Sequence, residues 1–463
     1  MEQNRVPQYH LPAELLRMVM ERIEYFGYVE EFIKPIIKPT HLARSTLLSV
    51  FLVNKAWAAE AIRILWKNPP VTALAAIKDR DRRQFYACHV QKLEVHHHEC
   101  KKWIAECSNL RDVTLPLLKF IGIYAARDVP ACDLHLCVEC CMGPSLEIVS
   151  YQSFHLDSKI LDLLRTQCPN LKRIAFLVDA FHEPAGINAL TELVDSCKCL
   201  RSITLYSFNK DLLIEALGRL QEGSNTGDSG VQHERLLRSI AHCNGLEQLA
   251  MNTIHEYKTF SMVLRSLERP FEDLSRLSLW TVLETRSASL LVSKLNPRSL
   301  TYLDLNLRID GITTNLLPLI CSRLVNLQHL SLNYVPLSRV DETERAFWTP
   351  LSDMLPLKNL KHLRHLTIHG LLLLPKLTDE VFIPMVENWP KLDALELRTN
   401  SELSTTSLNS LGKLCPRLGY LSIDGAYDLT DWQNIPRPIF PHLWGLSIYG
   451  SVDCFLDREG ESQ

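Results

Sequence analysis

Cysteines and histidines at metal-ligand spacing are the residues of this chain whose types could do chemistry. A Cys-x4-Cys-x2-Cys-Cys run comprises Cys132, Cys137, Cys140 and Cys141, with His135 inside it and His96–His98 and Cys100 upstream. Thiolates and imidazoles are the ligands of structural zinc, and the Cys-x2-Cys element has the usual spacing. A second pair at the conventional distance is missing. We therefore expect buried or surface thiols here and no metal site.

Motifs of the common catalytic and phosphate-binding sites are missing from the sequence. It contains no glycine-rich phosphate loop, no GxSxG and no HExxH. With 14 cysteines and 17 histidines, chance proximity of the two residue types is expected, so a thiol hydrolase is a weak interpretation. We expect no catalytic residue, no cofactor and a non-enzymatic function.

Composition narrows the class of protein further. The chain has 463 residues, 46% of them hydrophobic and 22% charged, which is ordinary for a folded protein with more than one domain or a repeat array. The net charge of −3 gives no reason to expect nucleic acid as a partner. No apolar stretch is long enough for a membrane span or a signal peptide. We expect reduced thiols and a cytoplasmic or nuclear location.

An internal repeat in the sequence determines the strands and helices on which any functional site must lie. The repeat is an apolar residue, two variable residues, an apolar residue, one variable residue and a third apolar residue. Its copies begin at Leu110, Leu146, Leu171, Leu200, Leu246, Leu274, Leu300, Leu327, Leu363, Leu392, Leu418 and Leu443, with a weaker copy at Val90/Leu93/Val95. From Leu246 onward, five of the seven spacings lie between 25 and 28 residues, the range of leucine-rich repeats.

This spacing predicts a parallel sheet backed by helices. The last residues of each copy alternate, so both apolar side chains of a short strand point to one face. Between the strands, segments such as Asn315–Arg323 and Ser404–Leu414 have helical periodicity. One repeat cannot bury its apolar face alone, so neighbours stack. We predict an α/β fold, a right-handed leucine-rich-repeat solenoid of about 12–13 repeats over residues 81–450, with a tail over residues 451–463.

Five cysteines lie three residues before the first leucine of a copy: Cys107, Cys168, Cys197, Cys243 and Cys415. This placement resembles the cysteine-containing subclass of leucine-rich repeats. Leu377-Thr378-Asp379 and Leu429-Thr430-Asp431 resemble the turn before the helix in that subclass. The alternative is that cysteine is simply a small buried residue at these positions.

Two long spacings interrupt the array. The first contains a polar, glycine-rich run, which predicts a mobile loop at about residues 221–232. This loop is either a regulatory or binding element or a tolerated insertion. The second contains Ser338–Thr349, where we expect another surface excursion.

The first 80 residues lack the repeat and form a predicted helical module. A helix is expected from Leu11, with Pro12 in its first turn and an apolar stripe, and a second helical stretch runs from Leu47 to Leu65. Leu11-Pro12-x-Glu14-Leu15-Leu16, Leu47-Leu48, Val53-Asn54-Lys55-Ala56-Trp57 and Leu65-Trp66 resemble an F-box. Asn54 departs from the usual cysteine of that family. The distance from Leu11 to Trp57 also requires an insertion, at about residues 24–45.

F-box followed by leucine-rich repeats is the arrangement of a family well represented in fungi, and the chain resembles it. The resemblance implies a substrate-recognition subunit of an SCF-type (Skp–cullin–F-box) E3 ubiquitin ligase, in which the F-box binds a Skp-type adaptor and through it a cullin and a RING subunit. The implied adaptor-binding residues are Leu11, Pro12, Leu15, Leu16, Leu48, Val53, Lys55 and Trp57. The F-box protein itself has no catalytic residue.

Side chains between the strand leucines should face solvent on the concave side of the sheet. Exposed aromatic and histidine residues there are candidate contacts for a target protein. The candidates are Tyr206, Trp280, Tyr302, His329, His365, His369, Arg398 and Tyr420. For any one of them, a merely solvated face is an equal alternative. For the whole chain the alternative is a non-ligase interaction scaffold whose N-terminal helices cap the solenoid. The target is not identified by the sequence, because the surface and not the fold decides it.

Overall fold

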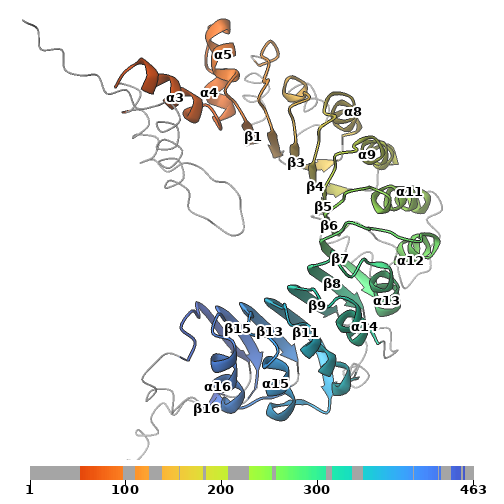
Figure 1. The fold of residues 1–463 in the computed structure, drawn as a ribbon. Helices are drawn as coiled ribbons and strands as arrows, with labels where there is room; N and C mark the ends of the chain where they lie inside the picture. Colours follow the sequence, from red (N-terminus) through yellow and green to blue (C-terminus); the bar gives the residue numbers. More distant parts are fainter. Residues whose placement is uncertain are drawn as a thin grey trace, which may run out of the picture. The chain divides into compact units, whose positions relative to one another are not determined.

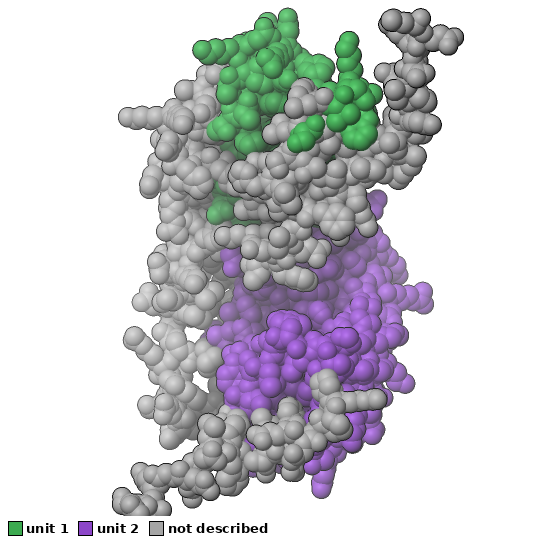
Figure 2. All heavy atoms as spheres, turned by 90° about the vertical axis from the view of Figure 1, so that its left-hand side faces the viewer, with its two compact units in different colours: residues 1–180 green, residues 181–463 purple. Residues whose placement is uncertain are grey.

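The structure is a computed structural model that forms two compact units, residues 1–180 and residues 181–463 (Figure 2). The residues it describes are 49, 53–96, 110–124, 138–155, 157–180, 184–206, 229–252, 257–308, 315–335, 348–399, 401–425, 427–428, 439–449 and 452–453. No helix of these ranges is long and apolar enough to cross a membrane.

In the described part of the first unit, helices precede a run of strands. The helices are α3 (Lys55–Leu65), α4 (Val71–Ala75) and α5 (Arg80–Ala87). The strands are β1 (Lys92–His96), β2 (Phe120–Tyr124), β3 (Ile148–His155) and β4 (Arg173–Ala180), with the 3₁₀ turn η2 (Glu139–Cys141) before β3 and helix α8 (Ser158–Gln167) before β4. Each strand pairs in parallel with the next along the chain.

The predicted helical stretch from Leu47 to Leu65 is interrupted. Ser49 is helical, Val53 lies in a turn, and α3 begins only at Lys55. The side chain of Asn54 accepts a hydrogen bond from the backbone N–H of Trp57 at 3.0 Å, which satisfies one of the free donors at the helix start. Asn54, which stands where the F-box motif usually has cysteine, is therefore the N-cap of α3.

The second unit repeats a strand and a helix (Figure 1). Its main strands are β5 (Ser202–Tyr206), β6 (Gln248–Met251), β7 (Arg276–Glu284), β8 (Tyr302–Arg308), β9 (His329–Val335), β11 (His365–Leu374), β13 (Ala394–Thr399), β15 (Tyr420–Asp424) and β17 (Gly445–Tyr449). Its helices are α9 (Pro184–Ser196), α11 (Ser229–Ala241), α12 (Tyr257–Ser266), α13 (Thr285–Lys294), α14 (Leu316–Arg323), α15 (Asp379–Val386) and α16 (Thr405–Leu414), with 3₁₀ turns η3 (Leu351–Asp353) and η4 (Leu355–Asn359). Short strands β10 (Trp348–Pro350), β12 (Leu377–Thr378), β14 (Ser401–Glu402), β16 (Tyr427–Asp428) and β18 (Val452–Asp453) complete it.

The main strands of this unit form one parallel sheet in chain order from β5 to β17, and β10 adds to β11. The pattern leucines stand in register, as in Leu303, Leu330 and Leu366 on three successive strands. All three are buried, and the helices cover the face to which they point (Figure 1). We call the opposite face, formed by the alternating residues between the leucines, the inner face of the sheet. The predicted leucine-rich-repeat architecture is confirmed.

One backbone contact recurs at each step of the array. The Thr301 carbonyl accepts the N–H groups of both Gln328 (2.8 Å) and His329 (3.0 Å) of the next repeat. The Gln328 carbonyl in turn accepts those of Arg364 (2.7 Å) and His365 (3.0 Å). Each strand start thus has its donors satisfied by the preceding repeat, which fixes the register before the leucines pack.

The repeated cysteines end helices and lead into strands. Cys415 follows α16, its carbonyl accepts the N–H of Leu418 at 3.1 Å, and its buried thiol donates to the Trp389 carbonyl of the preceding repeat at 3.3 Å. Cys168 has nearly the same backbone conformation at the end of α8. In other repeats Leu324 occupies this turn, so the position accepts several buried residues and cysteine is one of them. Cys107 lies outside the described residues.

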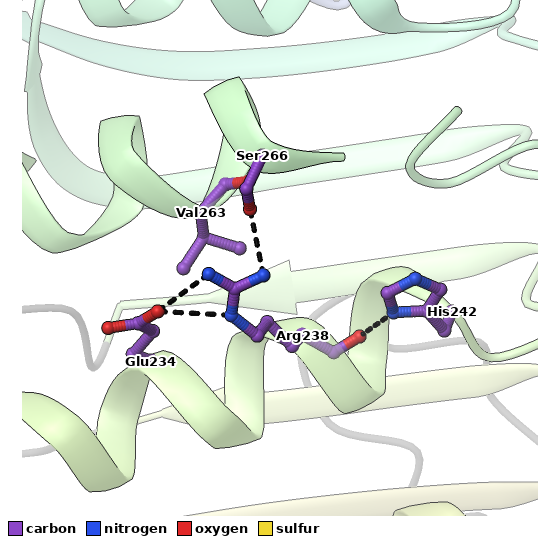
Figure 3. Close-up of polar contacts among 5 residues, drawn as sticks. All are labelled: Glu234, Arg238, His242, Val263 and Ser266. Carbon is purple, nitrogen blue, oxygen red and sulfur yellow. Dashed lines mark hydrogen bonds and ion pairs between the residues drawn. The ribbon is translucent and has the colours of Figure 1, made fainter. Parts of the chain in front are cut away.

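Polar ties connect neighbouring helices. Arg238 of α11 donates from Nε (3.0 Å) and Nη2 (2.7 Å) to Glu234 Oε1 and from Nη1 to Ser266 Oγ of α12 at 2.8 Å (Figure 3). The predicted Leu377-Thr378-Asp379 turn opens α15, and the Asp379 carboxylate accepts hydrogen bonds from the hydroxyls of Ser404 and Ser407 in the next repeat. Side-chain hydrogen bonds thus connect α11 to α12 and α15 to α16.

One predicted copy of the repeat is wrong. Leu110 lies in a turn, Val113 and Leu115 lie outside any strand, and the strand of that repeat is β2, whose apolar pattern comes eight residues later. Leu118, Ile121 and Ile123 fill the pattern instead and align with β1 and β3. β-branched Ile121 and Ile123 suit the buried strand, while the earlier apolar residues pack in the turn that precedes it.

Three predicted irregular segments contain regular structure at their ends. The loop assigned to residues 221–232 ends at α11, which begins at Ser229 because Leu236, Leu237 and Ile240 form a buried helical face. The excursion Ser338–Thr349 ends in β10, and the tail from residue 451 contains β18, paired with β16. The rest of the two segments and of the tail, like the insertion at residues 24–45, lies outside the described residues. The predicted division between residues 80 and 81 stays a prediction.

Candidate functional site

All eight predicted target contacts lie on the inner face of the sheet in the second unit. They alternate with buried leucines and isoleucines along their strands, because successive side chains of a strand point to opposite faces. Trp280 and Arg398 are exposed, and the other six are half-buried. The parallel register then assembles them into rows that cross the strands.

The first row is a run of rings at the strand starts. Arg276 lies over the Tyr302 ring at 4.5 Å, Tyr302 stacks on His329 with centroids 4.0 Å apart, and His329 meets His365 edge to face at 5.3 Å. These four residues, which we call the ring row, hold equivalent positions on β7, β8, β9 and β11. Burial, aided by His365, lowers the pKa of His329 to about 4, so its imidazole is neutral at physiological pH.

Trp280 is the centre of a second group, formed by residues further along the strands. Its ring meets Tyr206 edge to face with centroids 5.0 Å apart, and its Nε1 donates to Asp304 Oδ2 at 2.8 Å. The Ser278 hydroxyl donates to the same oxygen at 2.8 Å. Two donors thus fix the carboxylate, and the carboxylate fixes the indole.

A charged group follows on the later strands. Arg398 Nη2 lies 2.8 Å from Glu396 Oε1, and His369 Nε2 lies 3.1 Å from the same oxygen. The Arg398 guanidinium also lies 4.8 Å from the centre of the Tyr449 ring. Burial raises the pKa of Asp424 nearby, although Arg398 and His369 offset part of this effect.

Tyr420 lies apart from these groups, beside Trp444, with ring centroids 5.3 Å apart. Trp444 is 79% exposed and was not among the predicted contacts, because it precedes its strand rather than alternating within it. Arg276 was also missed. Its equivalence to Tyr302 in the repeat was the signal that could have found it.

The implied adaptor-binding residues are only partly within the described chain. Leu11, Pro12, Leu15, Leu16 and Leu48 lie outside it. Val53 and Lys55 are exposed, Val53 at 58%, and Trp57 in the first turn of α3 is half-buried. Their common role as an adaptor surface stays a prediction.

The candidate zinc ligands are likewise incomplete. Cys132, His135 and Cys137 lie outside the described residues. The Sγ atoms of Cys140 and Cys141 are 3.8 Å apart at η2. Within the described ranges no group of three or more histidine, cysteine or acidic side chains is arranged to hold a metal ion.

Stacked strand–helix repeats with leucines in register define the chain as a leucine-rich-repeat protein with an organised inner face. Neither a protein-family model nor a curated protein matches its sequence. Solved structures of similar fold include a chain of the Rad7 and Elc1 complex in yeast, 14% identical with a TM-score of 0.36, covering 84% of this chain and 93% of that one.

Two further solved structures are leucine-rich-repeat proteins or receptors. LegL7 of Legionella pneumophila is 11% identical with a TM-score of 0.33, covering 71% of this chain and 89% of that one. The Arabidopsis receptor kinase HAESA, in complex with the peptide hormone IDA and the co-receptor SERK1, is 13% identical with a TM-score of 0.32, covering 80% and 67%. Because these identities and TM-scores are low, the architecture of this chain is assigned from its own repeat geometry.

Proposed function

We propose that this protein is the substrate-recognition subunit of an SCF-type E3 ubiquitin ligase. Its F-box-like residues 9–70 would bind a Skp-type adaptor, and through it the cullin and RING subunits, while the inner face of the repeats binds the target. The chain itself would be non-catalytic. An associated E2 enzyme would supply the ubiquitin transfer.

The observation that carries the target-binding half is the ordered aromatic surface of the inner face. The ring row places four residues of the same strand position in contact across neighbouring strands. Trp280 leaves 37% of its surface exposed although its indole is fixed by a carboxylate. Aromatic and arginine side chains held rigid at a surface are the residues that dominate protein interfaces, since they lose little conformational entropy on binding.

The adaptor-binding half is supported by the F-box-like sequence and by the first turn of α3. There Val53 and Lys55 are exposed beside Trp57. We expect the full-length protein to co-purify with a Skp-type adaptor and the Leu15→Ala, Trp57→Ala variant to lose it. The matched control is a Trp280→Glu, His365→Glu variant, which should retain the adaptor. Failure of the wild type to bind any such adaptor would refute the ligase assignment.

The target-binding half has its own test. The Trp280→Glu, His365→Glu variant should abolish target capture. A charge that becomes buried without a partner at the centre of an interface is costly to desolvate. Circular dichroism and the thermal midpoint should stay near those of the wild type, since both side chains point away from the buried leucines. Unchanged recovery of every partner by this variant would contradict the proposal.

One observation favours the alternative function, an interaction scaffold capped by its N-terminal helices. The Lys67 carbonyl, just after α3, accepts the N–H groups of Gln91 and Lys92, each at 2.9 Å. This is the same contact that joins successive repeats, and Pro70 also bridges to Glu94 of β1. The helices thus continue the solenoid as a cap would, which solenoid ends require. Adaptor co-purification separates the two functions.

A further inference from the structure

We propose that Trp280, Tyr206 and Asp304 form a subsite that binds an arginine side chain of a partner protein. This inference rests on the target-binding part of the proposed function and adds the chemistry that the inner face would recognise there.

The subsite has two aromatic walls. The rings of Trp280 on β7 and Tyr206 on β5 are nearly perpendicular, at 82°, with centroids 5.0 Å apart. Two residues before Tyr206 and Trp280 on their strands, Thr204 and Ser278 share a register position with Ala250 of β6, which contributes only a methyl group. The indole reaches the Tyr206 ring across β6, and more than a third of its surface is exposed. A cation is attracted to such a ring face by the quadrupole of the π system.

A carboxylate stands at one edge of the same indole. Asp304 Oδ2 accepts from Trp280 Nε1 and from Ser278 Oγ, both at 2.8 Å, so the carboxylate is oriented by two neutral donors. Neither donor cancels its charge. Among the described residues, no lysine or arginine forms an ion pair with Asp304. Its Oδ1 atom is left to accept from a ligand, which completes an aromatic and anionic environment for one cation.

The same sheet already uses arginine–ring contacts between its own strands. Arg276 lies 4.5 Å from the Tyr302 ring centre, and Arg398 lies 4.8 Å from that of Tyr449. In the described chain, no basic side chain lies over the Trp280 ring. Arg276, the cation on the neighbouring strand position, is engaged on Tyr302. The charge and geometry at Trp280 thus match a guanidinium that a partner would supply.

Arginine fits better than lysine for a geometric reason. A planar guanidinium can stack on the indole while one of its edge N–H groups reaches Asp304, whereas an ammonium is a compact, strongly hydrated charge. The ligand is therefore a partner segment that presents an arginine to the inner face, and the rings of Tyr302, His329 and His365 beside it would receive an apolar neighbour of that arginine.

The test uses the full-length protein labelled with 5-fluorotryptophan, with the Trp280 fluorine resonance assigned by Trp280→Phe. The probes are N-acetyl-arginine methylamide, its neutral isostere N-acetyl-citrulline methylamide and N-acetyl-lysine methylamide. We expect the arginine probe to shift the Trp280 resonance with a saturable midpoint, the lysine probe to bind more weakly and the citrulline probe to leave the resonance in place.

Asp304→Asn keeps an oxygen for both internal donors and removes the charge, so it should raise the midpoint by about fivefold or more. The matched control is Asp393→Asn, at a carboxylate already paired with Arg417 at 3.0 Å, which should leave the midpoint unchanged. Equal shifts with citrulline, equal binding of lysine, or an unchanged midpoint in Asp304→Asn would each overturn the subsite. No adaptor takes part, so loss of this result leaves the ligase assignment to its own experiment.

Discussion

At the scale of single residues, two glycines with positive φ show how the backbone itself constrains this fold. Gly370 interrupts β11 with φ +73°, at the point where the register between β11 and β13 shifts. A Cβ atom there would lie 2.2 Å from the Tyr334 carbonyl oxygen. Gly245 has a similar φ of +78° but nothing within 4 Å of its Cβ position. Comparing substitutions at the two glycines therefore distinguishes the cost of a side chain at positive φ from the cost of a steric clash with a neighbouring backbone.

We expect Gly370→Ala to lower the free energy of unfolding clearly more than Gly245→Ala. Both variants place a side chain in the left-handed region, at a cost of about 1–2 kcal/mol. Only Gly370→Ala must also push a backbone carbonyl aside, which adds about 1 kcal/mol or more. Urea denaturation of the two variants measures the difference. Equal losses would show that the close approach relaxes freely.

The buried thiols differ from the exposed ones in reactivity. Burial raises the pKa of Cys321 and Cys415 to about 12. Since the thiolate is the nucleophile, at pH 8 only about one in ten thousand of these groups would be reactive. We expect iodoacetamide to modify exposed Cys199 in the native protein and to reach Cys321 and Cys415 only after unfolding, as read by peptide mass spectrometry. Comparable native labelling of Cys415 and Cys199 would contradict this.

At the scale of elements, the ring row links four strands through side chains that the repeat places in register. Its histidines are neutral because burial, more than any neighbouring charge, lowers their pKa. Protonation of His329 would put a cation between the Tyr302 ring and His365, with the Arg276 guanidinium near. The contact among the rings of Tyr302, His329 and His365 therefore depends on pH.

We expect His329→Phe to flatten the dependence of stability on pH. The folded pKa of His329 is about 4, below the ordinary 6.5, so below pH 6.5 the unfolded chain binds the proton more readily. The contribution to stability is complete above pH 6.5 and is lost as pH falls toward 4, by about 1–2 kcal/mol at pH 5. Phenylalanine keeps a ring for Tyr302 but does not titrate. Urea midpoints at pH 7 and pH 5 measure the effect, and His442→Phe, at an exposed histidine, is the control. Parallel curves for wild type and His329→Phe would contradict it.

The strands could be predicted from the sequence wherever leucine alone marks the buried positions. Leucines at LxxLxL spacing located the strands of the second unit because burial in register leaves little choice. The pattern failed at Leu110, where two overlapping apolar patterns compete and only the packing of Ile121 and Ile123 decides. The inner-face residues were also predictable from alternation. The contact of Trp280 with both Tyr206 and Asp304 was not, since it depends on the rotamers of these side chains.

At the scale of the whole molecule, a solenoid has no single core, and each repeat is stabilised mainly by its neighbours. Burial of equivalent residues along the second unit shows this dependence. Leu421 of β15 and Leu446 of β17 are paired in register, yet Leu421 is fully buried and Leu446 is 44% exposed. β15 has strands on both sides, whereas among the described strands β17 has β15 as its single neighbour in the sheet. The same residue in the same repeat position should therefore contribute differently to stability.

We expect Leu421→Ala to reduce the free energy of unfolding by about 2–5 kcal/mol and Leu446→Ala by less than about 1 kcal/mol. The first variant removes buried methyl groups between two neighbouring repeats and leaves a cavity, while the second removes groups that are already partly in water. Hydrogen exchange of peptides from β15 and β17, combined with urea denaturation, measures both effects. Faster exchange should extend from β15 into β13 and β17 in Leu421→Ala and stay within β17 in Leu446→Ala. Equal destabilisation by the two variants would mean that the last repeat is covered in solution as fully as the inner ones.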